Sequence, residues 1–402
     1  MLSSFSVTNF KSIKETATLD LQATTLTEHS DRIVLNKLGE KLLPFAVIYG
    51  PNGAGKSNIL EALFSMTRMI LVPYFLATLP KSNQRVNSSV AVNPFAFDPV
   101  QADAPTEFVI YFCGILAEYR YELHAHGSEI VYEKLDRKKY ETKKVSNIFY
   151  RNEDELHLTG EFSKLSIPQT LSPNLPVLSY LGITQIKHPV VEDVIGWFTT
   201  KIIVVNYGDP FVETNMIFKI TDDRTKKLVL AMMKEMDVDV VDYRIEDLPN
   251  ESFQIFTKHI VNEKEYELNL RDESSGTQKL FALLPLVANA LVLGKALVID
   301  ELDSKLHPML LNYLIKLFAN KSVNRHGAQL IFTSHDLTTM TRENFRRDEI
   351  WFVAKGDEQN SILYAMSDFK GTRSDDRYGK QYIAGKYGAD PYLKKIIDWE
   401  SL

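Results

Sequence analysis

The chain has 402 residues, of which 45% are hydrophobic and 24% are charged, and its formal net charge is -6. This composition describes a folded protein with a substantial core, and the acidic balance argues against sequence-independent binding of nucleic acid over the whole surface. The single cysteine, Cys113, excludes an internal disulfide and a cysteine-based zinc site, which suits a reducing compartment.

The first part of the chain predicts short strands at residues 2–7, 17–21 and 45–49. The third strand is wholly apolar and leads directly into Gly50-Pro-Asn-Gly-Ala-Gly-Lys-Ser57. This stretch fits the P-loop pattern GxxxxGK[ST], and the residues from Asn58 onward predict a helix. The order of strand, loop and helix distinguishes the motif from an ordinary glycine-rich turn.

A P-loop binds the phosphates of a nucleoside triphosphate. Its glycines let successive backbone N–H groups face the phosphates, and the dipole of the following helix favours the anion. Lys56 is placed for the β/γ oxygens, and the Ser57 hydroxyl is placed for Mg²⁺. We therefore expect ATP and Mg²⁺ as ligands, with ATP contacts from Asn52, Gly53, Ala54, Gly55, Lys56, Ser57 and Asn58.

Two regions separate the P-loop from the next motif. Between residues 88 and 150, period-two segments such as 107–112 alternate with glycine and charged turns, which predicts an antiparallel β meander. Residues 151–265 mix helical runs at 191–197 and 225–236 with proline turns, and we interpret them as an inserted, mostly helical lobe.

The apolar stretch from Phe281 to Ile299 is long enough to be mistaken for a membrane span. It is interrupted by Pro285, Asn289 and Gly294, so we interpret it as a buried helix, a turn and a buried strand. The first ten residues contain no basic segment followed by an apolar run. We therefore expect no signal peptide, no membrane partner and a cytoplasmic location.

The end of that stretch, Ala296-Leu-Val-Ile-Asp300-Glu301, is an apolar strand followed by two carboxylates, the Walker B pattern. Asp300 would hold Mg²⁺ through a water molecule, and Glu301 would polarise the attacking water. Solvated strand ends are often acidic, so the pattern alone does not establish a catalytic role for these carboxylates. The P-loop in the same chain favours the catalytic interpretation.

Three shorter motifs surround this strand: Glu273-Ser-Ser-Gly-Thr-Gln-Lys-Leu280, Leu302-Asp303-Ser-Lys-Leu-His-Pro308 and Gln329-Leu-Ile-Phe-Thr-Ser-His335-Asp336. In this order they resemble the signature loop, the D-loop and the switch histidine of ABC-type ATPases. The resemblance implies a homodimer in which ATP lies between the P-loop of one chain and the signature loop of the other. The residues it implies are the catalytic Glu301 and His335, the D-loop residue Asp303, the metal-binding Ser57 and Asp300, and the signature residues Ser274, Ser275, Gly276, Thr277 and Gln278.

The N-terminal segment Val7-Thr-Asn-Phe10-Lys11-Ser12 resembles the opening strand and turn of the SMC, RecF and OLD-like branch of these ATPases. That resemblance places Lys11 and Ser12 close to the nucleotide, with a solvated β-turn as the alternative. Gln84 and Gln101 lie in the region of a Q-loop, but neither has the expected context.

A further likeness is to the AAA-family ATPases of the abortive-infection group, AbiL-type and RloA-like, found in bacterial anti-phage systems. It rests on the motifs above together with residues 346–352 and the tail 382–391, where Lys386 stands in place of the family's arginine. Lysine keeps the charge but cannot form the two parallel hydrogen bonds that an arginine guanidinium makes to a carboxylate or phosphate. The resemblance implies an ATP-driven sensor or regulator that controls a separately encoded effector, a nuclease or toxin.

Three features would support an activity within the chain itself. His124 and His126 share a predicted strand face, Asp237, Asp239 and Asp242 form an acidic run, and residues 134–144 contain six basic side chains. Each also fits a solvated surface, which we prefer because the histidines lack a third ligand and the aspartates would lie on two strand faces. A DNA-repair ATPase of the RecF or SMC kind that binds DNA, and a self-contained nuclease or toxin, are the alternative functions.

The expected fold class is α/β: a P-loop NTPase with an ABC-type head, an antiparallel β subdomain and an inserted helical lobe. We expect an N-terminal lobe with the P-loop at 1–87, the β subdomain at 88–150, the inserted lobe at 151–265 and a C-terminal lobe with the remaining motifs at 266–402. The homodimer, with a higher oligomer left open, is the expected assembly, and nothing in the sequence supports a nucleic-acid partner.

Overall fold

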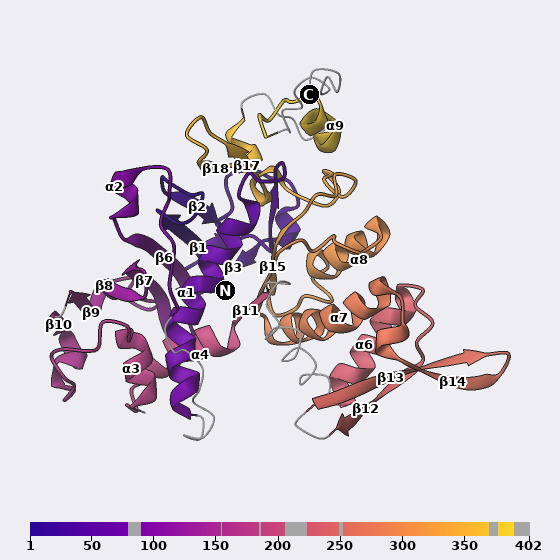
Figure 1. Ribbon diagram of the computed structural model, residues 1–402, viewed down its shortest axis with the longest axis horizontal. Coiled ribbons are helices and arrows are strands. Elements are labelled where there is room, and N and C mark those ends of the chain that lie inside the picture. Colours follow the sequence, from indigo (N-terminus) through magenta and orange to yellow (C-terminus); the bar gives the residue numbers. More distant parts are fainter. Residues whose placement is uncertain are drawn as a thin grey trace, which may run out of the picture.

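Two large sheets organise the protein, with one long helix between them (Figure 1). The computed structural model describes residues 1–78, 90–153, 155–184, 186–205, 223–248, 252–369 and 377–389. The fold class is α/β, as the sequence predicts.

The central sheet consists, in spatial order, of β11 (Ile202–Val205), β15 (Ala296–Ile299), β16 (Gln329–Thr333), β5 (Phe45–Tyr49), β17 (Ile350–Lys355) and β18 (Ser361–Ala365). The first five strands are parallel, and β18 is antiparallel to β17. Every residue of β5, β15 and β16 is buried, because helices cover both faces. The strand predicted at residues 45–49 is confirmed.

Three helices pack on this sheet: α1 (Lys56–Thr78), α7 (Ser275–Leu293) and α8 (Pro308–Ala319). The residues of β5 divide alternately between two cores. Ala46 and Ile48 share one core with α1, whereas Phe45, Val47 and Tyr49 share the other with α7 and α8. Alternation of this kind follows from the two-residue period of a strand.

The second sheet is antiparallel and has the order β10 (Glu155–Leu158), β9 (Val145–Asn152), β8 (Glu129–Lys139), β7 (Ala117–His126), β6 (Thr106–Cys113), β1 (Leu2–Thr8) and β2 (Ala17–Asp20). Strands β6 to β9 form the predicted meander. Helices α3 (Val177–Ile183) and α4 (Pro189–Thr200) share its core with α1.

Two buried carboxylates attach this sheet to the helices. Glu133 of β8 accepts hydrogen bonds from the N–H groups of Val177 and Leu178 at 2.6 and 3.0 Å, at the start of α3. Asp193 of α4 accepts from the N–H groups of Ile115 and Leu116, in the β6–β7 turn, at 2.7 and 2.8 Å. Each carboxylate satisfies backbone donors that burial would otherwise leave unpaired.

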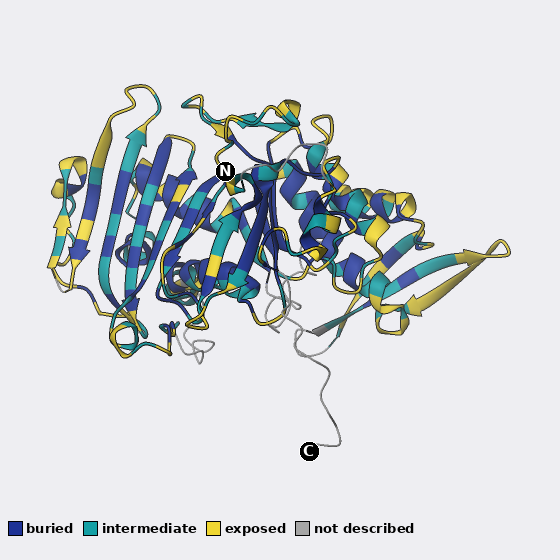
Figure 2. Ribbon diagram, turned by 90° about the horizontal axis from the view of Figure 1, so that it is seen from above, coloured by how far each residue is buried: buried dark blue, intermediate teal, exposed yellow. Residues whose placement is uncertain are grey.

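Residues 151–265 contain strands as well as helices in the part described. The helical runs predicted at 191–197 and 225–236 correspond to α4 and to α6 (Asp223–Glu235). Strand β11 joins the central sheet, and β12 (Asp242–Leu248) and β13 (Ser252–Val261) form a third sheet with β14 (Lys264–Asn269) beside α6. Tyr243 and Ile255 point into the core of α6 and α7, while neighbouring charged residues face solvent. This period-two pattern is the signal that the sequence prediction overlooked. Figure 2 shows the β13–β14 hairpin extending from the body, largely exposed.

The apolar stretch 281–299 has the predicted form. Helix α7 ends at Leu293, Gly294 adopts φ 61°, and β15 follows. A Cβ on Gly294 would lie 2.3 Å from the His326 carbonyl oxygen, so glycine is required at this turn. Two described helices, residues 56–77 and 275–293, are long and apolar enough to cross a membrane by length and composition alone; both line the cores described above.

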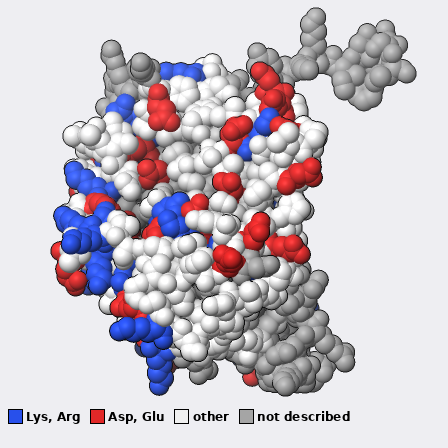
Figure 3. All heavy atoms as spheres, turned by 90° about the vertical axis from the view of Figure 1, so that its left-hand side faces the viewer, with Lys and Arg blue, Asp and Glu red and all other residues white. Residues whose placement is uncertain are grey.

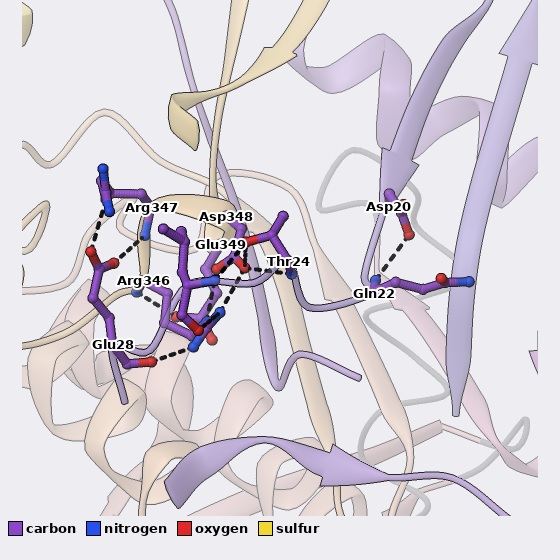
Figure 4. A network of polar contacts seen from close by, with 9 residues as sticks. Asp20, Gln22, Thr24, Glu28, Arg346, Arg347, Asp348 and Glu349 are labelled. Carbon is purple, nitrogen blue, oxygen red and sulfur yellow. Dashed lines mark hydrogen bonds and ion pairs between the residues drawn. The ribbon is translucent and has the colours of Figure 1, made fainter. Parts of the chain in front are cut away.

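The segment that follows β2 is anchored to residues just before β17 by a buried polar network (Figure 4). Arg346, fully buried, donates to both carboxylate oxygens of Asp348 at 2.8 Å, and Thr24 donates to the same carboxylate from its N–H and hydroxyl. Arg347 pairs with Glu28 at 2.8 Å. Burial raises the pKa of Glu349, in the same network, to about 8. In these contacts the Arg346-Arg347-Asp348 motif joins two distant parts of the chain.

The remaining short elements complete the described chain. They are β3 (Val34–Leu35), β4 (Lys41–Leu42), α2 (Pro99–Ala102), α9 (Tyr378–Ile383) and the 3-10 turns η1 (Ser30–Arg32), η3 (Gly160–Lys164), η4 (Leu270–Asp272), η5 (Arg347–Glu349) and η6 (Met366–Asp368).

Candidate nucleotide site

The candidate site lies where β5, β15 and β16 end. Because these strands are parallel, their carboxyl ends meet at one edge of the sheet, where α/β proteins bind ligands. Strand β16 lies between the other two, so its end separates the P-loop after β5 from Asp300 and Glu301 after β15. Burial lowers the pKa of Lys56, and the nearby carboxylates of Asp300, Glu301 and Asp303 act in the opposite direction. The structure therefore brings the two Walker motifs together.

The P-loop has the backbone that its glycines predict. Gly53 and Gly55 have φ values of 77° and 99°, in the left-handed region that favours glycine. Lys56 begins α1, and its ammonium group donates to the carbonyl oxygens of Gly50 and Pro51 at 2.9 and 3.2 Å. Both acceptors are neutral carbonyl oxygens of the loop. These two hydrogen bonds therefore hold the ammonium group beside the loop but do not neutralise its charge.

A chain of hydroxyl groups supports the P-loop from outside. Ser361 of β18 donates to the Ala54 carbonyl oxygen at 2.5 Å, so its single proton is used there. Ser12 therefore donates to Ser361 at 2.6 Å, and the Asn58 amide donates to Ser12 at 2.6 Å. A Cβ on Gly55 would lie 2.0 Å from the Ser361 hydroxyl oxygen and 2.4 Å from that of Ser12. Sequence reasoning identified Ser12 but missed Ser361, which belongs to no motif and reaches the P-loop only through folding.

Lys11 lies beside the same helix. Its backbone has φ 51°, its N–H donates to the Asn93 carbonyl oxygen at 2.8 Å, and its ammonium group pairs with Glu61 of α1. Lys11 and Ser12 thus contact the first turns of α1, although their role toward a nucleotide is a prediction.

Thr333, at the end of β16, organises the acidic pair. Its hydroxyl group donates to Asp300 Oδ1 at 2.5 Å and accepts from the Glu301 N–H at 2.7 Å. Glu301 has φ 48°, which is unusual for a residue with a side chain and marks local backbone strain. The Glu301 side chain itself is exposed. Thr333 was not identified from the sequence, since one hydroxyl in an apolar strand carries no motif.

Lys279 approaches the other side of Glu301. Its ammonium group donates to the carbonyl oxygens of Glu301 and Ser304 at 3.0 and 2.5 Å. The residue is only 8% exposed, and burial lowers its pKa to about 8. This lysine was also missed, although it directly follows the signature residues.

The signature residues form the start of α7. Ser274 caps the helix by accepting from the Thr277 N–H at 3.1 Å, so the helix begins at Ser275. Gln278 donates to the carbonyl oxygens of Arg271 and Glu273 at 3.1 and 2.8 Å. Ser274 and Ser275 are exposed. Within the described chain, the hydrogen bonds that involve the side chains of residues 274–278 stay between residues 271 and 278 and do not reach the P-loop.

Asp303 and His335 lie close to each other. Asp303 Oδ2 accepts from the His335 N–H at 3.0 Å, while its buried Oδ1 has no hydrogen-bond partner in the part of the chain described. The His335 side chain is exposed at the end of β16. The D-loop therefore fixes the backbone of His335 and leaves its imidazole open to solvent.

The residues at this edge fit a magnesium–nucleotide complex in their chemistry. Lys56 supplies a cation for phosphate oxygens, and Ser57 and Asp300 supply the hydroxyl and carboxylate oxygens that Mg²⁺ prefers. Thr333 orients the Asp300 carboxylate, and the unpaired buried oxygen of Asp303 provides a further acceptor. Their roles as ligands are proposals developed below.

The histidines and aspartates that would support a second activity in this chain lie apart from the candidate nucleotide site. His124 contacts Glu122 and stacks near Tyr132, and in the described chain no group of three or more His, Cys, Asp or Glu side chains is arranged to hold a metal ion. Asp237 and Asp239 lie in the loop before β12, which corrects their expected placement on a strand.

The basic residues of 134–144 lie on the β8–β9 hairpin and are partly neutralised. Lys134 pairs with Asp136, Arg137 with Glu161 and Lys138 with Glu40, at 2.9, 2.7 and 2.8 Å. Figure 3 shows lysine and arginine side chains on this side of the molecule intermixed with acidic ones. The mixture is typical of a solvated surface more than of a phosphate-binding groove.

Three other expected features are less informative. Gln84 lies outside the described residues, and Gln101 belongs to α2, where its carbonyl oxygen accepts from Asn9. In the tail, Lys386 donates to Gln381 at 3.1 Å, and residues 390–391 lie outside the described chain.

A P-loop followed by a helix, and a neighbouring parallel strand that ends in Asp-Glu, define a P-loop NTPase. Residues 45–341 match the family described as "AAA domain, putative AbiEii toxin, Type IV TA system". The match spans both Walker motifs, the signature residues and His335. This protein belongs to that family, and it is a P-loop ATPase of the AAA class.

Solved structures with a similar arrangement include heads of SMC proteins. The SMC head domain from Thermotoga maritima is 14% identical with a TM-score of 0.41, and the alignment covers 90% of this chain and 98% of that one. An SmcHead bound to the C-winged helix domain of ScpA is 13% identical with a TM-score of 0.44, covering 91% and 98%. An Smc head with an extended coiled coil, bound to the C-terminal domain of ScpA derived from Pyrococcus furiosus, is 13% identical with a TM-score of 0.42, covering 91% and 97%. No curated protein matches the chain.

Proposed function

We propose that this protein is an ATPase with an ABC-type head, in which two copies close around two ATP molecules and hydrolysis reopens them. One observation carries the proposal. The Walker motifs converge within the chain, whereas the hydrogen bonds of the signature residues are all local and Ser274 and Ser275 face solvent. An exposed helix start suits the γ-phosphate of an ATP held by another chain.

Each residue has a role in this proposal. Residues 52–58 bind the phosphates, Ser57 and Asp300 hold Mg²⁺, and Lys11 and Ser12 lie near the nucleotide. Bound Mg²⁺ would neutralise charge on the phosphate oxygens. Glu301 polarises the attacking water, His335 contacts the γ-phosphate, and Asp303 holds the backbone of His335. Thr333 keeps Asp300 and Glu301 in a fixed relation through its two hydrogen bonds.

The biological role we propose is a cytoplasmic sensor or regulator in anti-phage defence, which controls a separately encoded nuclease or toxin. The family description supports a role in such systems, since it names an abortive-infection toxin and a type IV toxin–antitoxin system. The ATP-driven opening and closing of the dimer would be the switch. An assembly larger than the dimer is compatible with this role.

The same family description favours one alternative, a toxin activity in this chain itself. The aspartates near residue 239 were one of its sequence candidates, and in the structure they lie in a loop and at the start of β12. Cleavage of DNA or tRNA by the purified protein, lost in Asp239→Ala and kept in Lys56→Ala, would support that alternative. A RecF-like or SMC-like repair function would instead require ATP-dependent binding of DNA.

The test is the solution mass of purified Glu301→Gln protein with and without ATP and Mg²⁺. This variant keeps the binding site but lacks the carboxylate that polarises water, so ATP should stay bound and dimers should accumulate. Ser275→Arg in the same background is the control, because a bulky cation at the helix start blocks closure. If both proteins bind ATP but neither changes its solution mass when ATP is added, the result contradicts the proposed dimer.

A further inference from the structure

A buried lysine side chain joins the loop after Walker B to the signature helix. Lys279 lies on the first turns of α7, directly after Gln278, and donates to the carbonyl oxygens of Glu301 and Ser304. Burying an ammonium group is costly unless it is hydrogen-bonded, and here two of its three donors are used on this one loop. The contact therefore joins two motifs that are more than 20 residues apart.

The position of these bonds matters because Glu301 has a strained backbone. Its φ of 48° persists only if its surroundings fix both of its peptide groups. Thr333 binds the N–H of Glu301, and Lys279 binds its carbonyl oxygen. The Ser304 N–H also donates to this carbonyl oxygen, at 3.0 Å, so removing Lys279 takes away one of the two donors found there in the described chain and fixes the direction of the Glu301 side chain less firmly.

The signature residues lie on the same helix as Lys279 and close to the same loop. A Cβ on Gly276 would lie 3.4 Å from the Lys305 carbonyl oxygen, so the helix start and the D-loop are in close contact. Ser274, Gly276 and Lys279 belong to the cap and first turns of one rigid helix. A displacement of the helix start by a ligand would therefore move the Lys279 ammonium and the Glu301 backbone together.

We propose that Lys279 is a positioning residue that transmits engagement of the signature loop to Glu301 of the same chain. This inference rests on the ATP-sandwich dimer proposed above. When the partner's ATP binds at Ser274–Gln278, the start of α7 is fixed in contact with its γ-phosphate. Lys279, on the same helix, then aligns the Glu301 carboxylate for the ATP held by the P-loop of its own chain. Each nucleotide would then be hydrolysed only after the opposite site has formed.

The experiment separates dimer formation from hydrolysis. Lys279→Met is compared with Lys295→Met, a matched control, because Lys295 lies just beyond the other end of α7 and is also 8% exposed. ATP affinity, ATP-dependent dimer formation in the Glu301→Gln background, and hydrolysis as a function of protein concentration are measured for each. Lys279→Arg, which keeps a cation with several donors, tests rescue.

We expect Lys279→Met to bind ATP within about twofold of the wild type and to dimerise with ATP, since neither role involves this side chain. Its turnover should be at least tenfold lower and should not rise when dimers form, an effect of the size expected when a catalytic group is misplaced. Lys295→Met should hydrolyse normally, and Lys279→Arg should recover much of the activity.

Two results would overturn the inference: turnover by Lys279→Met equal to that of Lys295→Met, or a folded Lys279→Met that no longer dimerises. If Lys279→Met melts below the assay temperature, Lys279→Gln takes its place, because its side chain is polar but one atom too short to donate to the Glu301 carbonyl oxygen, and the same loss of turnover is expected. A wild-type protein whose hydrolysis does not depend on dimer formation, and which Ser275→Arg leaves unchanged, would instead reject the proposed function.

Discussion

The two halves of the candidate site differ in how complete they are within one chain. At the Walker half, Thr333, Ser361 and Lys56 form hydrogen bonds that link four separate segments, and most of these groups are buried. At the signature half, Ser274 and Ser275 are exposed, and the hydrogen bonds are local. The first half is preorganised for a ligand, whereas the second half presents a helix start to solvent. If the proposed dimer forms, nucleotide binding and nucleotide-driven assembly should therefore be separable by mutation.

The largest expected effect comes from breaking the Walker half. Lys56→Ala removes the only cation that the P-loop itself contributes, so ATP affinity should fall by at least about 100-fold, a loss of roughly 2.7 kcal/mol. Isothermal titration calorimetry with ATP and Mg²⁺ measures it, and the melting temperature in the absence of ATP shows whether the fold is kept. Affinity within twofold of the wild type would refute the P-loop assignment.

Breaking the signature half should leave binding intact. Ser275→Arg places a long cation at the exposed helix start, so the monomer should bind ATP within about twofold of the wild type. Dimer formation should be lost and turnover should drop about tenfold or more, because the γ-phosphate loses its second set of contacts. Light scattering and a phosphate-release assay on one preparation give both values. Normal turnover by this variant would mean that the site is complete in one chain.

A smaller effect is expected at the support of the P-loop. Ser361→Ala removes the hydroxyl that joins Ser12 to the Ala54 carbonyl oxygen, and a single hydrogen bond contributes about 1 kcal/mol. ATP affinity should therefore fall roughly three- to tenfold, while ATP-driven dimerisation persists at saturating ATP. Gly55→Ala should be more severe, since its Cβ would collide with Ser361 and Ser12. If Ser361→Ala binds ATP as tightly as the wild type, the hydroxyl chain is only structural.

The smallest functional effect is expected from the buried network before β17, where stability should change and ATP binding should not. Glu349 has its pKa raised by burial to about 8 from an ordinary value of 4.5. Between these values the folded protein keeps a proton that the unfolded chain releases. The stabilising contribution of the neutral group is therefore complete below pH 4.5 and is lost as the pH rises through about 8.

Glu349→Gln cannot ionise, so from pH 5 to 8 it should lose less stability than the wild type. The difference should reach at least about 1 kcal/mol, since one pKa unit corresponds to about 1.4 kcal/mol. Urea unfolding at several pH values measures it, and Glu343→Gln, an exposed glutamate in the same segment, is the control. Parallel pH profiles for Glu349→Gln and the wild type would contradict a neutral, buried Glu349.

The local backbone of the candidate site could be predicted from the sequence where its residues are contiguous. Gly53, Gly55 and Lys56 act through the backbone of one loop, and their spacing alone predicts its geometry. The strand at 45–49, the β meander and the helix–turn–strand at 281–299 were predicted from hydrophobic periodicity and breakers. In residues 151–265 the helices at 191–197 and 225–236 were predicted, but the short alternating segments that form β12 and β13 were overlooked.

What the sequence by itself determined is the class of protein, because the P-loop and Walker B act through local backbone and are readable as spacing. The order of the strands was decided only by the tertiary structure, which places β16 between the two Walker motifs. Thr333, Ser361 and Lys279 acquire their contacts in the same way. Each is a single polar side chain in an ordinary segment, and its partners are 22 to 349 residues away. Only the packing of sheet and helix brings such groups within hydrogen-bond distance.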